Sequence, residues 1–191
     1  MNLEAGVRIK EGHAEIAEHP LQDARFMLAL KKGKGEENMQ ISRTKDFESI
    51  AGLNRYVHEL HADLYPEYFK EYDFEAIKTF FRKKMDNEAF IFLLLKDDDQ
   101  ALGYAWIELR NYPETGFKKP YTSIYVHQIS IDDSQRKKGY GSALMNKVAD
   151  IAKENGIHKI ELDYWSKNET AKSFYEKNDF VKYREFVYKD I

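Results

Sequence analysis

Apolar positions along the chain recur with two periods, and from residue 39 onward they predict a mixture of strands and helices. Alternating or continuous apolar runs predict strands at residues 39–43, 89–95, 101–110, 121–131 and 159–165, and one or two strands at 180–187. Apolar residues three or four apart, preceded by Asp or Asn caps or by glycines, predict helices at residues 46–61, 74–84, 140–154 and 168–177. This order favours an α/β (α+β) fold with a mixed central sheet that is mainly antiparallel in its first half.

Residues 1–38 lack this regular pattern, and we expect them to be an N-terminal extension ahead of a domain at residues 39–191. The stretch Lys31–Asn38 is rich in Lys, Gly and Glu, which is typical of a flexible charged linker to an accessory arm. The same composition also fits a translated purine-rich leader, with Met39 as the natural start and residues 1–38 foreign to the native protein. Both interpretations stay open.

Composition excludes several classes of chemistry. The 191 residues suffice for one domain with a substantial core, and a net charge of −3 does not favour nucleic acid as a partner. There is no cysteine, so disulfides, thiolate nucleophiles and thiolate metal sites are excluded. The longest apolar stretch, Ala89–Leu95, is too short to span a bilayer, so no membrane partner is expected. A cytoplasmic protein is the expectation.

The segment Ile129–Leu144 runs from a strand pattern through a polar turn into a helix, and it contains the motif R-x-x-G-x-G at Arg136–Gly141. The first N–H groups of a helix have no partner within it, and glycines allow a ligand to approach the backbone closely. The segment therefore predicts a phosphate or pyrophosphate site. It fits neither a Walker loop nor a dinucleotide fingerprint, and spacing alone equally allows a simple strand-to-helix turn.

Two later motifs give this loop a context. Asn168–Ala171 reads N-x-x-A, and Phe174-Tyr175 is followed by Phe180. With the R-x-x-G-x-G loop, in this order and spacing, the chain from about residue 39 to 191 resembles the GNAT superfamily of N-acetyltransferases. One departure is Asp179, where the family usually has glycine; Asp tolerates the left-handed conformation that such a turn needs.

The resemblance implies a GNAT-like sheet flanked by about four helices, with strands 121–131 and 159–165 splayed apart, and acetyl-CoA as cosubstrate. It implies that the backbone of Ile129 and Ile131 binds the pantetheine arm and that Asn168 lies near the sulfur, although Asn168 could also simply cap a helix. The implied pyrophosphate loop consists of Arg136, Lys137, Lys138, Gly139, Tyr140, Gly141 and Ser142. Tyr175 is the expected general acid, because a phenol with a pKa of about 10 can protonate a departing thiolate.

The sequence does not select the general base. Tyr125, His127 and Gln128 lie on the strand before the loop, and Glu108 lies on the neighbouring strand. Strand parity cannot choose among them, because the corresponding family strand often carries a bulge.

Two other features lie on the side where the family binds its acceptor. His58 and His61 are three residues apart rather than the four of a zinc-protease motif, so no metal is expected. The aromatic residues of 64–74 are read as a wall for the acceptor, able to hold a cation, although any one of them could be simple packing.

We therefore predict an N-acetyltransferase that transfers the acetyl group directly to a primary amine. The acceptor, a small molecule or a peptide, is not readable from the sequence. The alternative is a catalytically silent acyl-CoA-binding sensor of the same fold. A nucleic-acid site at Lys137 and Lys138 is disfavoured, because the basic cluster is confined to one turn. A homodimer that pairs the C-terminal strands is possible.

Overall fold

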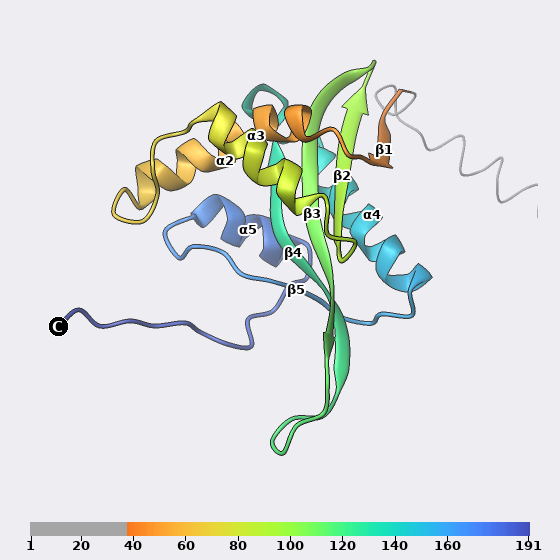
Figure 1. Cartoon of the computed structure of the whole chain (residues 1–191), viewed down its shortest axis with the longest axis vertical. Helices are drawn as coiled ribbons and strands as arrows, with labels where there is room; N and C mark the ends of the chain where they lie inside the picture. Colours follow the sequence, from red (N-terminus) through yellow and green to blue (C-terminus); the bar gives the residue numbers. More distant parts are fainter. Residues whose placement is uncertain (1–37) are drawn as a thin grey trace, which may run out of the picture. The chain divides into compact units, whose positions relative to one another are not determined.

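The structure is a computed structural model that describes residues 38–191 (Figure 1). The expectations for the arm and linker in residues 1–37 lie outside the described residues. In chain order the elements are β1 (Gln40–Arg43), α2 (Phe47–Leu64), α3 (Phe74–Lys84), β2 (Phe90–Asp97), β3 (Gln100–Tyr112), β4 (Tyr121–Ile131), a 3₁₀ turn η1 (Asp133–Gln135), α4 (Tyr140–Glu154), β5 (Ile160–Leu162) and α5 (Glu169–Lys177).

The strands form one five-stranded sheet in the order β1-β2-β3-β4-β5. The first four strands are antiparallel neighbours, and β5 is parallel to β4 because α4 carries the chain back across the sheet. The β4–β5 pairing covers only Ile124–Val126 against Ile160–Leu162, whereas β4 continues to Ile131. The mixed, mainly antiparallel sheet and the splayed strands are thus confirmed.

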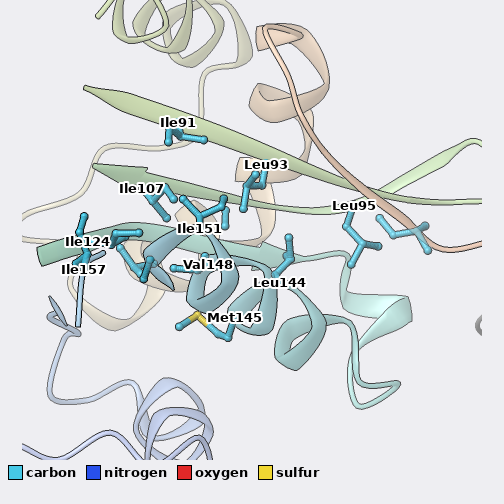
Figure 2. Packing of buried hydrophobic residues seen from close by; sticks show 14 residues of the cluster. Ile91, Leu93, Leu95, Ile107, Ile124, Leu144, Met145, Val148, Ile151 and Ile157 are labelled. Carbon is cyan, nitrogen blue, oxygen red and sulfur yellow. The ribbon is translucent and has the colours of Figure 1, made fainter. Parts of the chain in front are cut away.

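Alternation along the strands produces two cores, one on each face of the sheet. Leu93 and Leu95 of β2 face the first core, whereas Phe92 and Leu94 face the second. Helix α4 covers the first face, and Figure 2 shows its side chains between those of the strands. Helices α2 and α3 cover the second face. The buried α4 residues are Leu144, Met145, Val148, Ile151 and Ala152.

Three helix starts follow the cap residues in the sequence. The side chains of Asp46, Asp73 and Asn168 each accept a hydrogen bond from the backbone N–H three residues on. Such a bond satisfies one of the free donors of the first turn. Helix α2 continues three residues beyond the predicted end, to Leu64.

Two strand predictions were wrong: one strand is shorter than predicted, and the other does not form. The strand predicted at 159–165 forms only at Ile160–Leu162, because the following chain leaves β4 and Trp165 packs against Tyr65 instead, at 4.6 Å between ring centres. Residues 180–187 form no strand (Figure 1). An alternating pattern becomes a strand only where a neighbouring backbone offers hydrogen bonds, and this segment contacts β5 through a side chain: the Tyr183 hydroxyl donates to Glu161 at 2.8 Å.

Candidate active site

The loop between β4 and α4 presents a row of backbone donors. The first hydrogen bond of α4 runs from the Ala143 N–H to the Gly139 carbonyl at 3.0 Å. Within the described part of the chain, the N–H groups of residues 137–142 have no acceptor. Lys137 and Gly139 adopt φ values of 66° and 90°, and left-handed residues of this kind turn successive N–H groups into one hollow. Such a hollow at the positive end of a helix can hold a pyrophosphate.

Glycine is required at the two positions of the motif for different structural reasons. At Gly139 the φ of 90° would strain any residue with a Cβ, although such a Cβ would meet nothing within 4 Å. At Gly141 a Cβ would lie 3.1 Å from an edge carbon of the Phe174 ring. Gly141 therefore allows close packing of α4 against α5, the helix that carries Tyr175. The sequence motif alone suggested one role for both glycines, the close approach of a ligand.

The side chains of the loop divide into two groups. Lys137 is exposed, and Lys138 is exposed while its ammonium donates to Gln135 at 2.7 Å. Arg136 instead forms an ion pair with Asp133 at 2.5 Å. The Tyr140 hydroxyl donates to Asp97 at 2.6 Å, which ties α4 to the β2–β3 turn. All three basic side chains are thus exposed, but only Arg136 is held in an ion pair with a carboxylate, whereas the backbone amides and the two lysines carry no such anionic partner among residues 38–191.

Beyond Val126, β3 is the one strand among residues 38–191 that pairs with β4. Ile129 and Ile131 pair with Ala105 and Gly103 of β3. On the opposite edge the last described partner is Leu162, opposite Val126. The backbone of β4 at Ile129 and Ile131 therefore has hydrogen-bonding groups on an edge that no described strand pairs; its role toward the pantetheine arm stays a prediction.

Asn168 caps the start of α5 and Tyr175 lies about two turns further along this helix, and each is 7% exposed. Asn168 caps the helix through its bond to the Ala171 N–H at 2.9 Å, so the capping role is confirmed. Burial, and then the charge of Asp163, raise the pKa of Tyr175 above its ordinary value, so that its hydroxyl stays protonated. No hydrogen-bond partner for this hydroxyl lies among residues 38–191, which leaves its proton available to a ligand.

A polar bridge crosses the gap where β4 and β5 separate. The Tyr125 hydroxyl donates to Asp163, which follows β5 directly. The Arg110 guanidinium lies 3.5 Å from the centre of the Tyr125 ring. Burial and the Asp163 carboxylate raise the pKa of Tyr125, so this hydroxyl also remains protonated. The sequence analysis did not single out Asp163 or Arg110; the alternation of Glu108 and Arg110 on β3 was the available signal for the latter.

The bulge that the family pattern suggested is present at His127. Trp106 pairs with Gln128 and Ile107 pairs with Val126, so His127 is the extra residue on β4. A bulge places two adjacent side chains on the same face. His127 stacks on Trp106 with ring centres 4.2 Å apart, and its Nε2 lies 2.8 Å from the Glu108 carboxylate.

Gln128 has a structural role. Its side-chain oxygen accepts from the Tyr104 hydroxyl at 2.8 Å and from the Asn54 amide at 3.1 Å. Asn54 belongs to α2, so these bonds fix α2 on the second face of the sheet.

Aromatic side chains of the α2–α3 loop gather around Trp165, and their role as a wall for the acceptor stays a prediction. Tyr65, Tyr68 and Phe69 each lie within 5.5 Å of the Trp165 ring, centre to centre. Tyr68 is 56% exposed and Trp165 is 37% exposed, so part of this cluster faces solvent.

The two histidines of α2 support this loop. His58 Nε2 lies 2.8 Å from the Lys70 carbonyl, and His61 packs on Phe69 with ring centres 5.0 Å apart. Residues 38–191 contain no group of three His, Cys, Asp or Glu placed to hold a metal ion. They also contain no helix that is long and apolar enough to cross a membrane.

Comparison with known proteins agrees with this geometry. The model of the acetyltransferase (GNAT) family matches residues 54–180, which include the loop and the α5 residues described above. The chain belongs to this family. A curated relative, an uncharacterized N-acetyltransferase YhfO from Bacillus subtilis, is 22% identical over 152 residues, which are 79% of this chain and 94% of the relative.

Solved structures share the fold. A mutant of the BH1408 protein from Bacillus halodurans superimposes with a TM-score of 0.75 at 21% identity, over 80% of this chain and 99% of that chain. The aminoglycoside N-acetyltransferase AAC(6')-Iy, solved in complex with CoA, superimposes with a TM-score of 0.61 at 15% identity, over 80% of this chain and 94% of that chain. The protein is an N-acetyltransferase by family.

Proposed function

We propose that the protein uses acetyl-CoA to acetylate a primary amine by direct transfer. The observation that carries the proposal is the combination of three features: the N–H groups of residues 137–142 without an acceptor in residues 38–191, the edge of β4 beyond Val126 that β5 does not pair, and the protonated Tyr175 hydroxyl on α5. These features match the two ends of acetyl-CoA. The loop amides suit its pyrophosphate, and the Tyr175 hydroxyl suits the thiolate that departs from its thioester. The absence of cysteine excludes a thiolate as a covalent carrier.

Each part of this site would bind a different part of acetyl-CoA. The loop amides with Lys137 and Lys138 would hold the pyrophosphate, while Arg136 and Tyr140 keep the loop in shape through Asp133 and Asp97. The backbone at Ile129 and Ile131 would orient the pantetheine arm, and Asn168 would fix the start of α5 beside it. When bound, acetyl-CoA supplies an acyl group activated as a thioester.

Tyr175 would give its proton to the sulfur as the carbon–sulfur bond breaks. A group with a raised pKa keeps this proton at neutral pH, which matches the role of an acid. The protonated Tyr125 and the Asp163 carboxylate lie beside it and would meet the incoming amine. Asp163 carries a negative charge that would attract an ammonium group before it is deprotonated.

The aromatic cluster around Trp165 would form the wall of the acceptor site. Lys167 places its ammonium 4.6 Å from the centre of the Tyr65 ring, a contact that supports a role for these ring faces in holding cations. A cationic amine would be held in the same way on the exposed part of the cluster. Aminoglycosides, which are acceptors of the structural neighbour named above, carry such amines, and they belong in the first panel of candidates.

We further propose a homodimer in which the C-terminal segment 180–191 is covered by a second copy. Phe186 is 100% exposed, Val187 is 82% exposed and Ile191 is 116% exposed, so nothing within residues 38–191 covers them. The strand β5 lies at the end of the sheet, with one edge unpaired. In a two-fold dimer, the C-terminal segment of each copy could pair with the β5 edge of the other copy. This pairing would cover the exposed apolar side chains and give the β5 edge a partner.

The assignment of residues 39–191 as the catalytic domain, with 1–38 as an extension, is also part of this proposal. So is a cytoplasmic location, which is consistent with a sequence that contains no cysteine.

Release of free thiol from acetyl-CoA, measured with a panel of monoamines, polyamines, aminoglycosides and peptide amines, tests the function. Acceptor-dependent release is the expected result. CoA binding without release for any acceptor would instead favour the silent sensor.

A further inference from the structure

The bulge on β4 places a histidine at the point where the gap between β4 and β5 opens. Val126 is the last residue of β4 that pairs with β5, and His127 follows it directly. Its ring lies 5.0 Å from the ring of Tyr125, whose hydroxyl bridges the gap to Asp163. Besides burial, the Asp163 charge and Tyr125 raise the pKa of Tyr175, which places Tyr175 near both residues. His127 on β4 and Tyr175 on α5 thus each lie near Tyr125, whose hydroxyl bonds to Asp163.

We propose that His127 is the proton acceptor for the attacking amine and that Glu108 is the positioning residue that orients its ring. This inference rests on the proposed acetyl transfer. Of the candidates on β3 and β4, Gln128 is held by Tyr104 and Asn54 and cannot accept a proton, and Tyr125 is already a donor to Asp163.

The hydrogen bond to Glu108 decides which ring nitrogen is free. Burial disfavours the Glu108 carboxylate, but its bonds to Arg110 and His127 outweigh burial and lower its pKa, so Glu108 is ionised. An ionised carboxylate only accepts hydrogen bonds, hence His127 Nε2 carries the proton. In the neutral ring the lone pair then lies on Nδ1. No partner for Nδ1 occurs among residues 38–191.

The surroundings of His127 keep the ring neutral. It is 20% exposed and lies between the rings of Trp106 and Phe90. Burial lowers its pKa most; Glu108 raises the pKa in part, and the positive charges of Arg110 on β3 and Lys84 on α3 lower it again. Tyr125 faces it from its own strand and is neutral. A neutral imidazole at pH 7 can take a proton.

With these two residues, every bond and proton in the acetyl transfer is accounted for. The amine nitrogen bonds to the carbonyl carbon with its lone pair and gives one N–H proton to His127 Nδ1. The carbon–sulfur bond breaks with its electron pair on sulfur, and sulfur takes the Tyr175 proton. His127 and Tyr175 return to their starting states by passing one proton back through solvent. The products are one amide and one thiol.

The test measures kcat against pH at saturating acceptor for the wild type, His127→Gln and Glu108→Gln. His127→Gln should lower kcat at pH 7 by about 100-fold or more, the usual size of a general-base contribution. Its affinity for CoA should stay within about twofold of the wild type. Because Glu108 raises the pKa of His127, Glu108→Gln should move the acidic limb of the profile to lower pH. A packing defect alone would not shift this limb.

The outcomes separate the two proposals. His158→Gln, an exposed histidine before β5, is the matched control and should behave as the wild type. If the wild type acetylates an amine but His127→Gln keeps both kcat and the acidic limb, the inference is wrong and the function stands. If the wild type releases no thiol with any amine, the proposed function itself fails. If His127→Gln does not fold, an unshifted acidic limb in Glu108→Gln overturns the inference.

Discussion

The two glycines of the phosphate loop should fail in different ways when each is replaced by alanine. Gly139→Ala meets no steric contact, but it must hold a φ of 90°. The left-handed region costs a residue with a Cβ about 1–2 kcal/mol. This cost falls on the loop conformation that binds the pyrophosphate, and it corresponds to about a 5- to 30-fold loss of CoA affinity. The turnover of the bound complex should change little.

Gly141→Ala creates crowding instead. The new Cβ would lie 3.1 and 3.3 Å from two carbons of the Phe174 ring. Overpacking costs about 1–3 kcal/mol, and alanine in place of glycine in a helix recovers about 1 kcal/mol. The net loss of folding stability should therefore be about 0–2 kcal/mol. Because Phe174 precedes Tyr175, the displaced ring should lower kcat more than it lowers CoA affinity.

Calorimetric titration with CoA, thermal unfolding and steady-state kinetics distinguish these effects. The double variant Gly141→Ala/Phe174→Leu should recover stability, because the smaller side chain makes room for the Cβ. If Gly141→Ala weakens CoA binding as strongly as Gly139→Ala does, and Phe174→Leu gives no recovery, the division of roles between the glycines is refuted.

Three further predictions concern other parts of the molecule. Tyr175→Phe should lower kcat by about 100-fold or more with nearly unchanged CoA affinity, measured by kinetics and titration, and unchanged turnover would remove Tyr175 from the mechanism. Burial of Glu161 is outweighed by its bonds from Ser123 and Tyr183, which lower its pKa; its contribution to stability is therefore present above the pKa of the unfolded chain and is lost as the pH falls through the lower folded pKa. Melting temperatures from pH 6 to pH 3 should fall more steeply in the wild type than in Glu161→Gln, and parallel curves would contradict this. Phe186→Ser should convert a dimer into a monomer in sedimentation experiments, whereas Phe117→Ser, equally exposed on the β3–β4 loop, should not; a monomeric wild type would disprove the dimer.

Local patterns predicted most of the elements, because the physical causes are local. The caps Asp46, Asp73 and Asn168 act within one helical turn, and the strand periods reflect which face is buried. The segment 180–187 failed for the opposite reason. Its alternation is real, but a strand needs a second backbone, and a neighbour cannot be read from the segment itself.

The candidate site divides in the same way. The loop at residues 136–142 and Tyr175 carry recognisable motifs, so the sequence indicated them. The bulge at His127 depends on the register between β3 and β4, and the bridge from Tyr125 to Asp163 depends on how β4 and β5 diverge. The packing of Gly141 against Phe174 depends on how two helices meet. These relations arise from pairing and packing, which a single sequence does not display.

The central claim is acetyl transfer from acetyl-CoA to an amine, and mass spectrometry of the acceptor tests it most directly. The wild type, incubated with acetyl-CoA and the panel of amines, should add one acetyl group to at least one acceptor and release one thiol for each product. Tyr175→Phe should form that product far more slowly. Tight CoA binding with no acetylated product from any amine would contradict the account.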